Sequence, residues 1–300
     1  MSRANFRARK IWVSDQLFMG SQSAFVVKEV DGTQSTINLA DLAALDNVSD
    51  DDKNTAVGKA AGDSITAGSG QQNSSFGEDS GTAITTGDDN TALGYNALSA
   101  ASTTSDSTAI GSGALALNTA EGNTALGKGA LDANVTGLRN VAVGLDAGGA
   151  QAGTTDDDNT LIGHNAGSLM NGSGSGGNTV VGSLAADACV TSVDVTAVGI
   201  SSLSASTANG NTAVGARSLA ANVTGLRNVA IGVDAGATQA GTTDDDNTWV
   251  GNLAGNVATG SASGGNTAVG SNAMLVSTTA IDCVGVGFNA LAANITGNTL

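Results

Sequence analysis

Two runs of three aspartates are the clearest candidates for chemistry in this chain of 300 residues. Ca²⁺ takes carboxylate oxygens as ligands, so Asp156, Asp158, Asp244 and Asp246 are candidate calcium ligands, above all if copies from different chains converge. Such runs are also common in solvated loops, and we favour that interpretation. We therefore expect no resident metal and no cofactor.

Enzymatic function is not favoured by the remaining polar residues. His164 is the only histidine, so one chain cannot build a triad that needs histidine or a histidine-based zinc site. The enzymatic alternative is a polysaccharide-cleaving tailspike that works with two carboxylates. Such enzymes need aromatic sugar platforms, whereas this chain has 2 Trp, 1 Tyr and 5 Phe. We expect no enzyme.

Other short motifs have plain interpretations. The glycine-rich stretch "NGSGSGGN" at Asn171 lacks the lysine of a phosphate-binding loop. Asn134, Asn222 and Asn294 each begin an Asn-X-Thr tripeptide, which we interpret as a turn rather than a glycosylation site. Cys189 and Cys283 do not make a disulfide framework, and we expect both thiols to be free.

The elements that carry these residues are copies of one motif, Asn-Thr-Ala-(Val/Leu/Ile)-Gly-x-x-Ala-(Gly/Leu). Successive glycines of the motif lie 16 to 19 residues apart, and a longer period of 88 residues overlies the short one. The motif glycines are Gly58, Gly77, Gly94, Gly111, Gly127, Gly144, Gly163, Gly182, Gly199, Gly215, Gly232, Gly251, Gly270 and Gly287.

A unit of this length is too short for a pair of helices, and its Thr and Val favour a strand. Each unit therefore predicts one coil of a β-solenoid, with a strand, a glycine corner and a polar return loop. In the unit that begins at Asn90, alternation sends Thr91 and Leu93 to one side and Ala92 to the other. We expect Leu93 to fill the interior, Ala92 to face another chain, and the asparagines to stack in a ladder. The two residues after Gly94 vary freely between units, and we expect them to face solvent.

Composition indicates that one chain is not stable alone. One or two large apolar residues per coil cannot offset the entropy of ordering the whole coil, so we expect homo-oligomers with the alanine faces together. The formal charge of −16 disfavours nucleic acid as a partner. No apolar run is long enough to insert in a membrane, and no secretion signal is seen, so we expect a product made in the cytoplasm.

The repeats "NTALGYNAL", "STAIGSGAL", "NTAVGARSL" and "NVAIGVDAG" resemble the YadA-like head repeats of trimeric autotransporter adhesins. The resemblance covers residues 54–300 and implies a left-handed parallel β-roll, all-β, that assembles as a homotrimer. The coils here are longer than the usual turn of that family. No membrane anchor or coiled-coil stalk follows, and the final "GNTL" opens a further unit, so we expect the molecule to continue.

Residues 1–53 have a different composition. "KIWVSDQLFMG" and "SAFVVKEVDGTQSTINL" predict strands, the second with a hairpin turn at Asp31 and Gly32, and a linker follows. Half of the aromatic residues lie here, and four of the eleven basic residues fall in the first ten positions. Arg7, Arg9, Trp12, Phe18 and Phe25 are the candidate attachment residues, because aromatic and arginine side chains anchor interfaces.

These features together suggest a bacteriophage head or tail fibre. An N-terminal attachment module, residues 1–53, would dock on capsid or tail proteins, and a repeat shaft, residues 54–300, would project toward a glycan or protein of the host surface. The protein would then be found in the virion. The alternative is a fragment of a bacterial cell-surface trimeric adhesin, and a polysaccharide-cleaving tailspike ranks below both.

Overall fold

The structure is a computed structural model that describes residues 53–66, 69–150, 157–170, 176–239, 244–258 and 264–293, and the backbone of two strands nearer the N-terminus. The chain divides into two compact units, residues 1–43 and 44–300. Each unit is treated by itself. Residues 39–52, around the boundary expected at residue 53, lie outside the described part.

The first unit contains an antiparallel pair of strands, β1 (Ala24–Lys28) and β2 (Gln34–Asn38). Ala24 pairs with Asn38, and Lys28 pairs with Gln34. This register confirms the hairpin expected from "SAFVVKEVDGTQSTINL". The expected turn at Asp31 and Gly32 and the earlier strand "KIWVSDQLFMG" lie outside the described residues.

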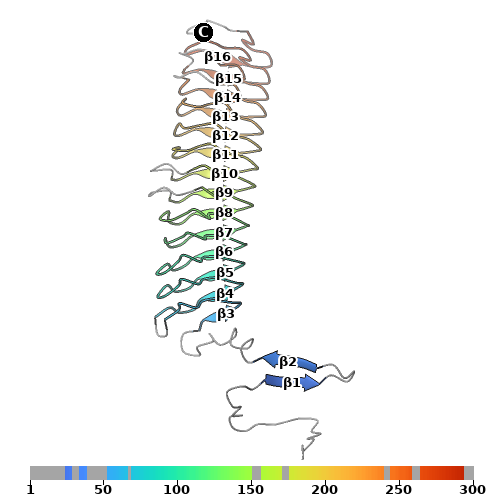
Figure 1. The fold of residues 1–300 in the computed structure, drawn as a ribbon. Coiled ribbons are helices and arrows are strands. Elements are labelled where there is room, and N and C mark those ends of the chain that lie inside the picture. Colours follow the sequence, from blue (N-terminus) through green and yellow to red (C-terminus); the bar gives the residue numbers. More distant parts are fainter. Residues whose placement is uncertain are drawn as a thin grey trace, which may run out of the picture. The chain divides into compact units, whose positions relative to one another are not determined.

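The second unit is a parallel β-solenoid (Figure 1). Fourteen strands of three residues stack in chain order in one parallel sheet, and the residues described contain no helix. The all-β solenoid expected from the repeats is thus confirmed. The strands are β3 (Thr55–Val57), β4 (Ser74–Phe76), β5 (Thr91–Leu93), β6 (Thr108–Ile110), β7 (Thr124–Leu126), β8 (Val141–Val143), β9 (Thr160–Ile162), β10 (Thr179–Val181), β11 (Thr196–Val198), β12 (Thr212–Val214), β13 (Val229–Ile231), β14 (Thr248–Val250), β15 (Thr267–Val269) and β16 (Val284–Val286).

The register between strands keeps each motif residue above its equivalent. Thr91 pairs with Thr108, Ala92 with Ala109 and Leu93 with Ile110, without any slip. The same in-step pairing holds for each neighbouring pair from β3 to β16. Each motif position therefore becomes a column along the stack, with one residue about every 4.8 Å.

The glycine after each strand is required by its backbone. Gly94 has a φ of +135°, and a Cβ built on it would lie 2.6 Å from the carbonyl oxygen of Gly111 in the next coil. An L side chain is therefore excluded twice, by conformation and by space. The other thirteen motif glycines also hold φ values between +123° and +145°.

The asparagine before each strand points inward and forms the expected ladder. The backbone N–H of Asn73 donates to Oδ1 of Asn54 at 2.8 Å, and that of Asn90 donates to Oδ1 of Asn73 at 3.0 Å. Each side-chain carbonyl thus accepts one backbone N–H of the next coil. Ser107, Val195 and Cys283 occupy the ladder position once every 88 residues and interrupt it.

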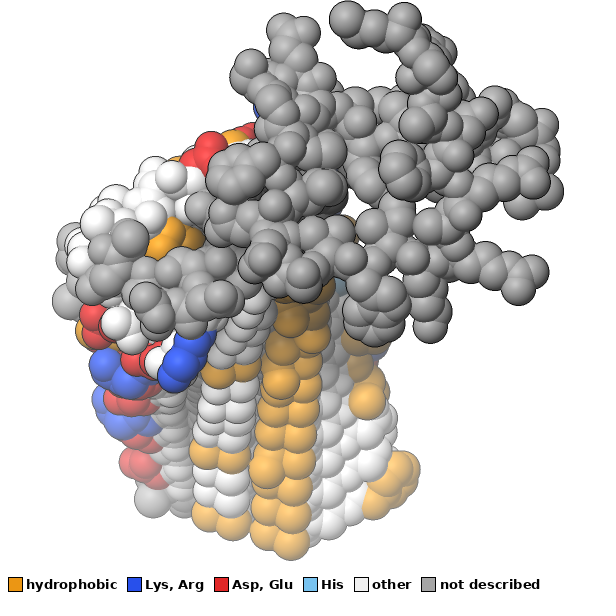
Figure 2. Space-filling model, turned by 90° about the horizontal axis from the view of Figure 1, so that it is seen from below, with side chains coloured by type: hydrophobic (Ala, Val, Ile, Leu, Met, Phe, Trp, Pro, Cys, Tyr) orange, Lys and Arg blue, Asp and Glu red, His pale blue; other side chains and the backbone are white. Residues whose placement is uncertain are grey.

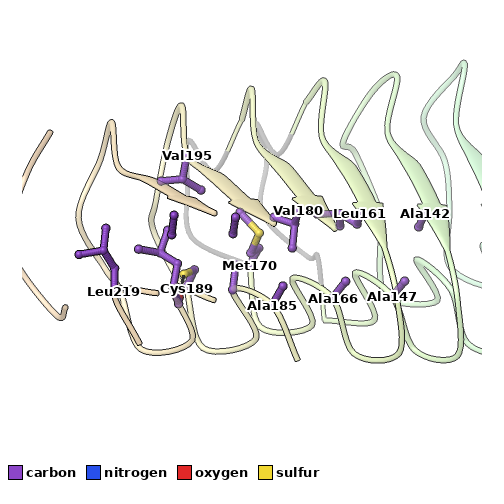
Figure 3. Close-up of a cluster of buried hydrophobic side chains, with 14 of the residues drawn as sticks. Ala142, Ala147, Leu161, Ala166, Met170, Val180, Ala185, Cys189, Val195 and Leu219 are labelled. Atoms are coloured by element: carbon purple, nitrogen blue, oxygen red, sulfur yellow. Dashed lines mark hydrogen bonds between the residues drawn. The ribbon is translucent and has the colours of Figure 1, made fainter. Parts of the chain in front are cut away.

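The core of the solenoid is narrow, and its volume is shared between positions of one coil (Figure 3). Leu161 and Met170 both lie 2.8 Å from where a Cβ on Gly167 would be. In the equivalent coil 88 residues later, Trp249 covers Gly255, and Ala258 stands where Met170 stood. A larger residue in the middle of the strand, Trp249 in place of Leu161, is thus matched by a smaller residue across the interior, Ala258 in place of Met170, as close packing requires.

Candidate functional site

The outward side of the fourteen strands extends along the whole parallel sheet of the solenoid. In each strand the middle residue is buried, while the first and third residues are half-buried or exposed. We call the first and third residues of β3–β16 the strand face. Figure 2 shows hydrophobic side chains stacked in an unbroken column along the molecule. The third residues more than one-third exposed are Val57, Phe76, Leu93, Leu126, Ile162, Ile231, Val269 and Val286.

This arrangement corrects the sequence analysis. We expected Leu93 inside and Ala92 outside, but Ala92 is fully buried and Leu93 is 48% exposed. The reason is the width of the interior: Asn90 and Ala92 point into a coil that one large side chain already fills. The alanines therefore pack inside their own chain and cannot form the contact between chains that we expected of them.

The strand face carries no charge. Its first residues are Thr, Ser or Val and its third residues are Val, Leu, Ile or Phe, so none of the 2 × 14 side chains is ionisable. This is notable in a chain with 38 charged residues (11 basic and 27 acidic). Monomeric proteins rarely expose such a contiguous apolar surface, and patches of this kind mark interaction sites.

Two columns border the strand face. We call the residue two positions before the ladder residue of each coil its leading residue, and the residue directly after the corner glycine its trailing residue. Leu138 and Leu145 are an example from the coil of β8. The trailing residues Tyr95, Leu145 and Ile200 are 58%, 43% and 62% exposed, as expected for a variable position that faces solvent.

Ion pairs connect neighbouring coils beside the leading edge. Arg139 forms a bidentate pair with Asp158, with Nε–Oδ1 and Nη2–Oδ2 distances of 2.7 and 2.8 Å, and Arg227 pairs with Asp246 in the same way. The hydrogen bond from Arg139 lowers the pKa of Asp158. These side chains are more than half exposed, so each pair adds little stability.

The aspartate runs have structural roles. Oδ1 of Asp157 accepts the backbone N–H of Leu138 at 2.8 Å, and Oδ1 of Asp245 accepts that of Leu226 at 2.7 Å. Of the calcium candidates, Asp158 and Asp246 are the arginine partners, Asp244 is buried, and Asp156 lies outside the described residues. Within the described ranges, no group of three His, Cys, Asp or Glu side chains is placed to hold a metal ion.

The other candidate residues have separate outcomes. Arg7, Arg9, Trp12 and Phe18 lie outside the described residues, and Phe25 is placed in β1 by its backbone alone. His164 is an exposed trailing residue. Cys189 and Cys283 are buried and form no disulfide, which confirms the expectation that they are not linked.

The Asn-X-Thr tripeptides prove to be turns where they are described. Asn134 and Asn222 are fully buried. Oδ1 of Asn134 accepts the N–H of Gly137 at 3.0 Å, while its Nδ2 donates to Oδ1 of Asn118 at 2.9 Å. Because the amide nitrogen is engaged inside the coil, it cannot carry a glycan in the folded chain.

The chain was also compared with known proteins. No family model, curated protein or solved structure matches it. No helix in the part of the chain that the structure describes is long and apolar enough to cross a membrane. The strand face and its two borders therefore carry the functional argument.

The position of the strand face could have been found in the sequence. Large residues occur at the middle strand position only where the wall opposite is small, as Leu161 with Gly167 and Trp249 with Gly255 show. Such compensation is typical of residues that share one enclosed space. By contrast, the third strand position accepts Val, Leu, Ile or Phe without any matching change, which is typical of a surface outside the packed interior.

Proposed function

We propose that the strand face is where copies of this chain associate, as a homotrimer around an axis parallel to the stack. The observation that carries this proposal is the uncharged strand face, which extends over fourteen strands, or about 60 Å at the β spacing. Burial of its aliphatic side chains would be worth about 25 cal/mol per Å². The resemblance to YadA-like head repeats favours three chains over two.

We further propose that this trimer is a structural component of a bacteriophage virion, a head or tail fibre. The N-terminal segment would attach it to capsid or tail proteins, and the solenoid would be the shaft that projects toward the host surface. A stack that grows by one strand per coil supports a shaft, because its length is set by the number of coils. The glycan or protein of the host surface would be met by the loops of the shaft.

Sedimentation equilibrium tests the trimer. We expect a mass of 3 × 28.9 kDa, or about 87 kDa. Leu126→Asp would place a carboxylate on the strand face, where Leu126 is 46% exposed, and should shift the protein toward monomers. Leu117→Asp is the matched control, because Leu117 is 54% exposed but lies away from the strands. A monomeric parent chain, or equal effects of both variants, would contradict this assembly.

Electron microscopy of virions with gold-labelled antibody against residues 54–300 tests the location. We expect label on projections from the head or the tail. Label confined to the surface of bacterial cells would instead support the adhesin alternative, and label that never sediments with particles would rule out a virion component.

A further inference from the structure

In several coils the leading and trailing residues change together between the copies of the 88-residue period. In three equivalent coils, both positions are serine, then both are aliphatic, then both are larger and apolar. The pairs are Ser105 with Ser112 in the coil of β6, Val193 with Ile200 in that of β11, and Ile281 with Phe288 in that of β16.

Charge follows the same rule. In the coil of β7, Glu121 leads and Lys128 trails, and both side chains are exposed. In the equivalent coil of β12 these residues are Asn209 and Ala216, so both charges have been lost together. Neither charge is kept without the other in this coil, although other coils carry a charge at one edge only, as Asp88 with Tyr95 shows. The two positions therefore behave as residues that contact each other.

They cannot make this contact within one chain. Leu138 and Leu145 are separated by the ladder residue, the extended strand β8 and the corner glycine, a span of at least about 13 Å of extended chain. The two residues stand at opposite borders of the strand face. Leu145 is nevertheless 43% exposed, and Leu138 is half-buried, so both offer apolar surface to a neighbour.

We propose that the leading edge of each chain packs against the trailing edge of a neighbouring copy, with every coil opposite the same coil. The inference rests on the proposed association through the strand face, and it adds which edges meet and at what level. Rotation about an axis parallel to the stack brings these edges together with no axial offset. Leu138 then meets the partner's Leu145, and Glu121 meets the partner's Lys128.

The matching of leading and trailing residues within one coil also favours one arrangement of the chains over others. An antiparallel pair of chains would place the coil of β4 opposite a coil near the other end, so same-coil matching would serve no purpose there. A head-to-tail arrangement with an axial shift would match each coil with a different one. Only a closed ring of parallel chains makes each coil its own partner, from the coil of β4 to that of β16.

Cysteine cross-linking tests which edges of neighbouring chains meet and whether equivalent coils lie opposite each other. The double variant Leu138→Cys with Leu145→Cys, treated with a short bis-maleimide, should give covalent trimers on a denaturing gel. Each single variant and the unsubstituted chain are controls that should stay uncross-linked, because Cys189 and Cys283 are buried. The mismatched control is Leu138→Cys with Ile200→Cys, whose edges lie three strands apart, or about 14 Å along the stack.

The outcomes are distinct. Cross-links in the matched variant alone support the proposal. If the matched variant sediments as a trimer but does not cross-link, or if the mismatched variant cross-links equally well, the edge pairing is overturned while the trimer stands. If the parent chain sediments as a monomer, the proposed function fails, and the edge pairing fails with it.

A charge reversal gives a second test that needs no cross-linker. Glu121→Lys alone and Lys128→Glu alone each place like charges at one level of the assembly, three times in a trimer, and should weaken association several-fold. The double reversal should restore the association of the parent chain. Equal weakening in the double variant would overturn the contact, because these exposed positions do not affect the fold of one coil.

Discussion

The indole Nε1 of Trp249 donates a hydrogen bond to Oε1 of Gln239 inside the solenoid, at a distance of 3.0 Å. Nε2 of Gln239 in turn donates to the backbone oxygen of Asp244 at 2.6 Å. Two successive buried hydrogen bonds thus connect the indole to the backbone. The largest side chain of the interior thus has its one donor satisfied, which lets an indole occupy a coil otherwise lined with alanine and asparagine.

The exchange between Trp249 and the pair Leu161 with Met170 predicts strong coupling. Trp249→Leu should lower the free energy of unfolding by about 2–4 kcal/mol, because it leaves a cavity over Gly255. Ala258→Met alone should overpack the same space and cost about 1–3 kcal/mol. The double variant recreates the combination of Leu161 and Met170 found in the equivalent coil. It should therefore be more stable than the sum of the two single effects predicts.

Denaturant unfolding of the four proteins in this cycle measures the coupling. We expect an interaction energy of about 1–3 kcal/mol in favour of the double variant. Additive effects would mean that Trp249 and Ala258 do not share one space.

A corner glycine should tolerate no side chain. Gly94→Ala places a Cβ 2.6 Å from the carbonyl oxygen of Gly111 at a φ of +135°. The coil must open, and we expect a loss of more than about 2 kcal/mol in the free energy of unfolding. Gly122→Asn is the matched control. Gly122 has a φ of +71°, which asparagine accepts, and the nearest atom to its Cβ is 3.5 Å away. Thermal melts that respond equally to both changes would contradict this view of the corner.

The thiol of Cys189 should be inert while the chain is folded. Burial raises its pKa to about 12, and its Sγ lies 3.0 Å from the backbone oxygen of Leu203. Ellman's reagent at pH 8 should therefore react with it only after unfolding. The folded pKa of this thiol is above its unfolded pKa of about 8.5. The contribution of the buried thiol to the free energy of unfolding is therefore fully present below about pH 8.5 and is lost as the pH rises toward 12. Fast reaction of the folded protein would contradict this burial.

The proposed division of function near residue 53 can be tested with two deletions. Removal of residues 1–53 should leave a folded trimer that no longer joins virions. Removal of the 88 residues 200–287 should shorten the shaft by five coils, or about 24 Å, without loss of attachment. Particle co-sedimentation and electron microscopy measure both. If the chain without residues 1–53 still binds particles, the repeats of residues 54–300 are the attachment element.

The sequence predicted the solenoid because each repeated residue has one local reason to be there. Gly94 needs a positive φ, and Asn73 and Asn90 satisfy backbone groups of neighbouring coils. Alternation within one strand did not reveal which side faces inward, because Thr91, Ala92 and Leu93 alternate equally well in either sense. Hydrophobicity favours Leu93 inside, and the narrow interior of the folded coil reverses that choice.

The edges of the strand face were missed for another reason. Leu138 and Leu145 belong to positions that vary between neighbouring units, so they resemble unconstrained surface until equivalent coils are compared. Asp157 was likewise interpreted as part of an acidic loop, although its carboxylate accepts a backbone N–H of the preceding coil. Neither relationship is local in sequence, and both became visible when the coils were stacked.

The interruptions of the asparagine ladder have a mechanical consequence. Hydrogen bonds between coils run along the length of the solenoid, so a pull on its two ends loads them in series and the weakest joint yields first. At Ser107, Val195 and Cys283 no asparagine supplies a side-chain carbonyl to the coil above. Under tension, the solenoid would open first at these joints, while the segments of several coils between them stay wound.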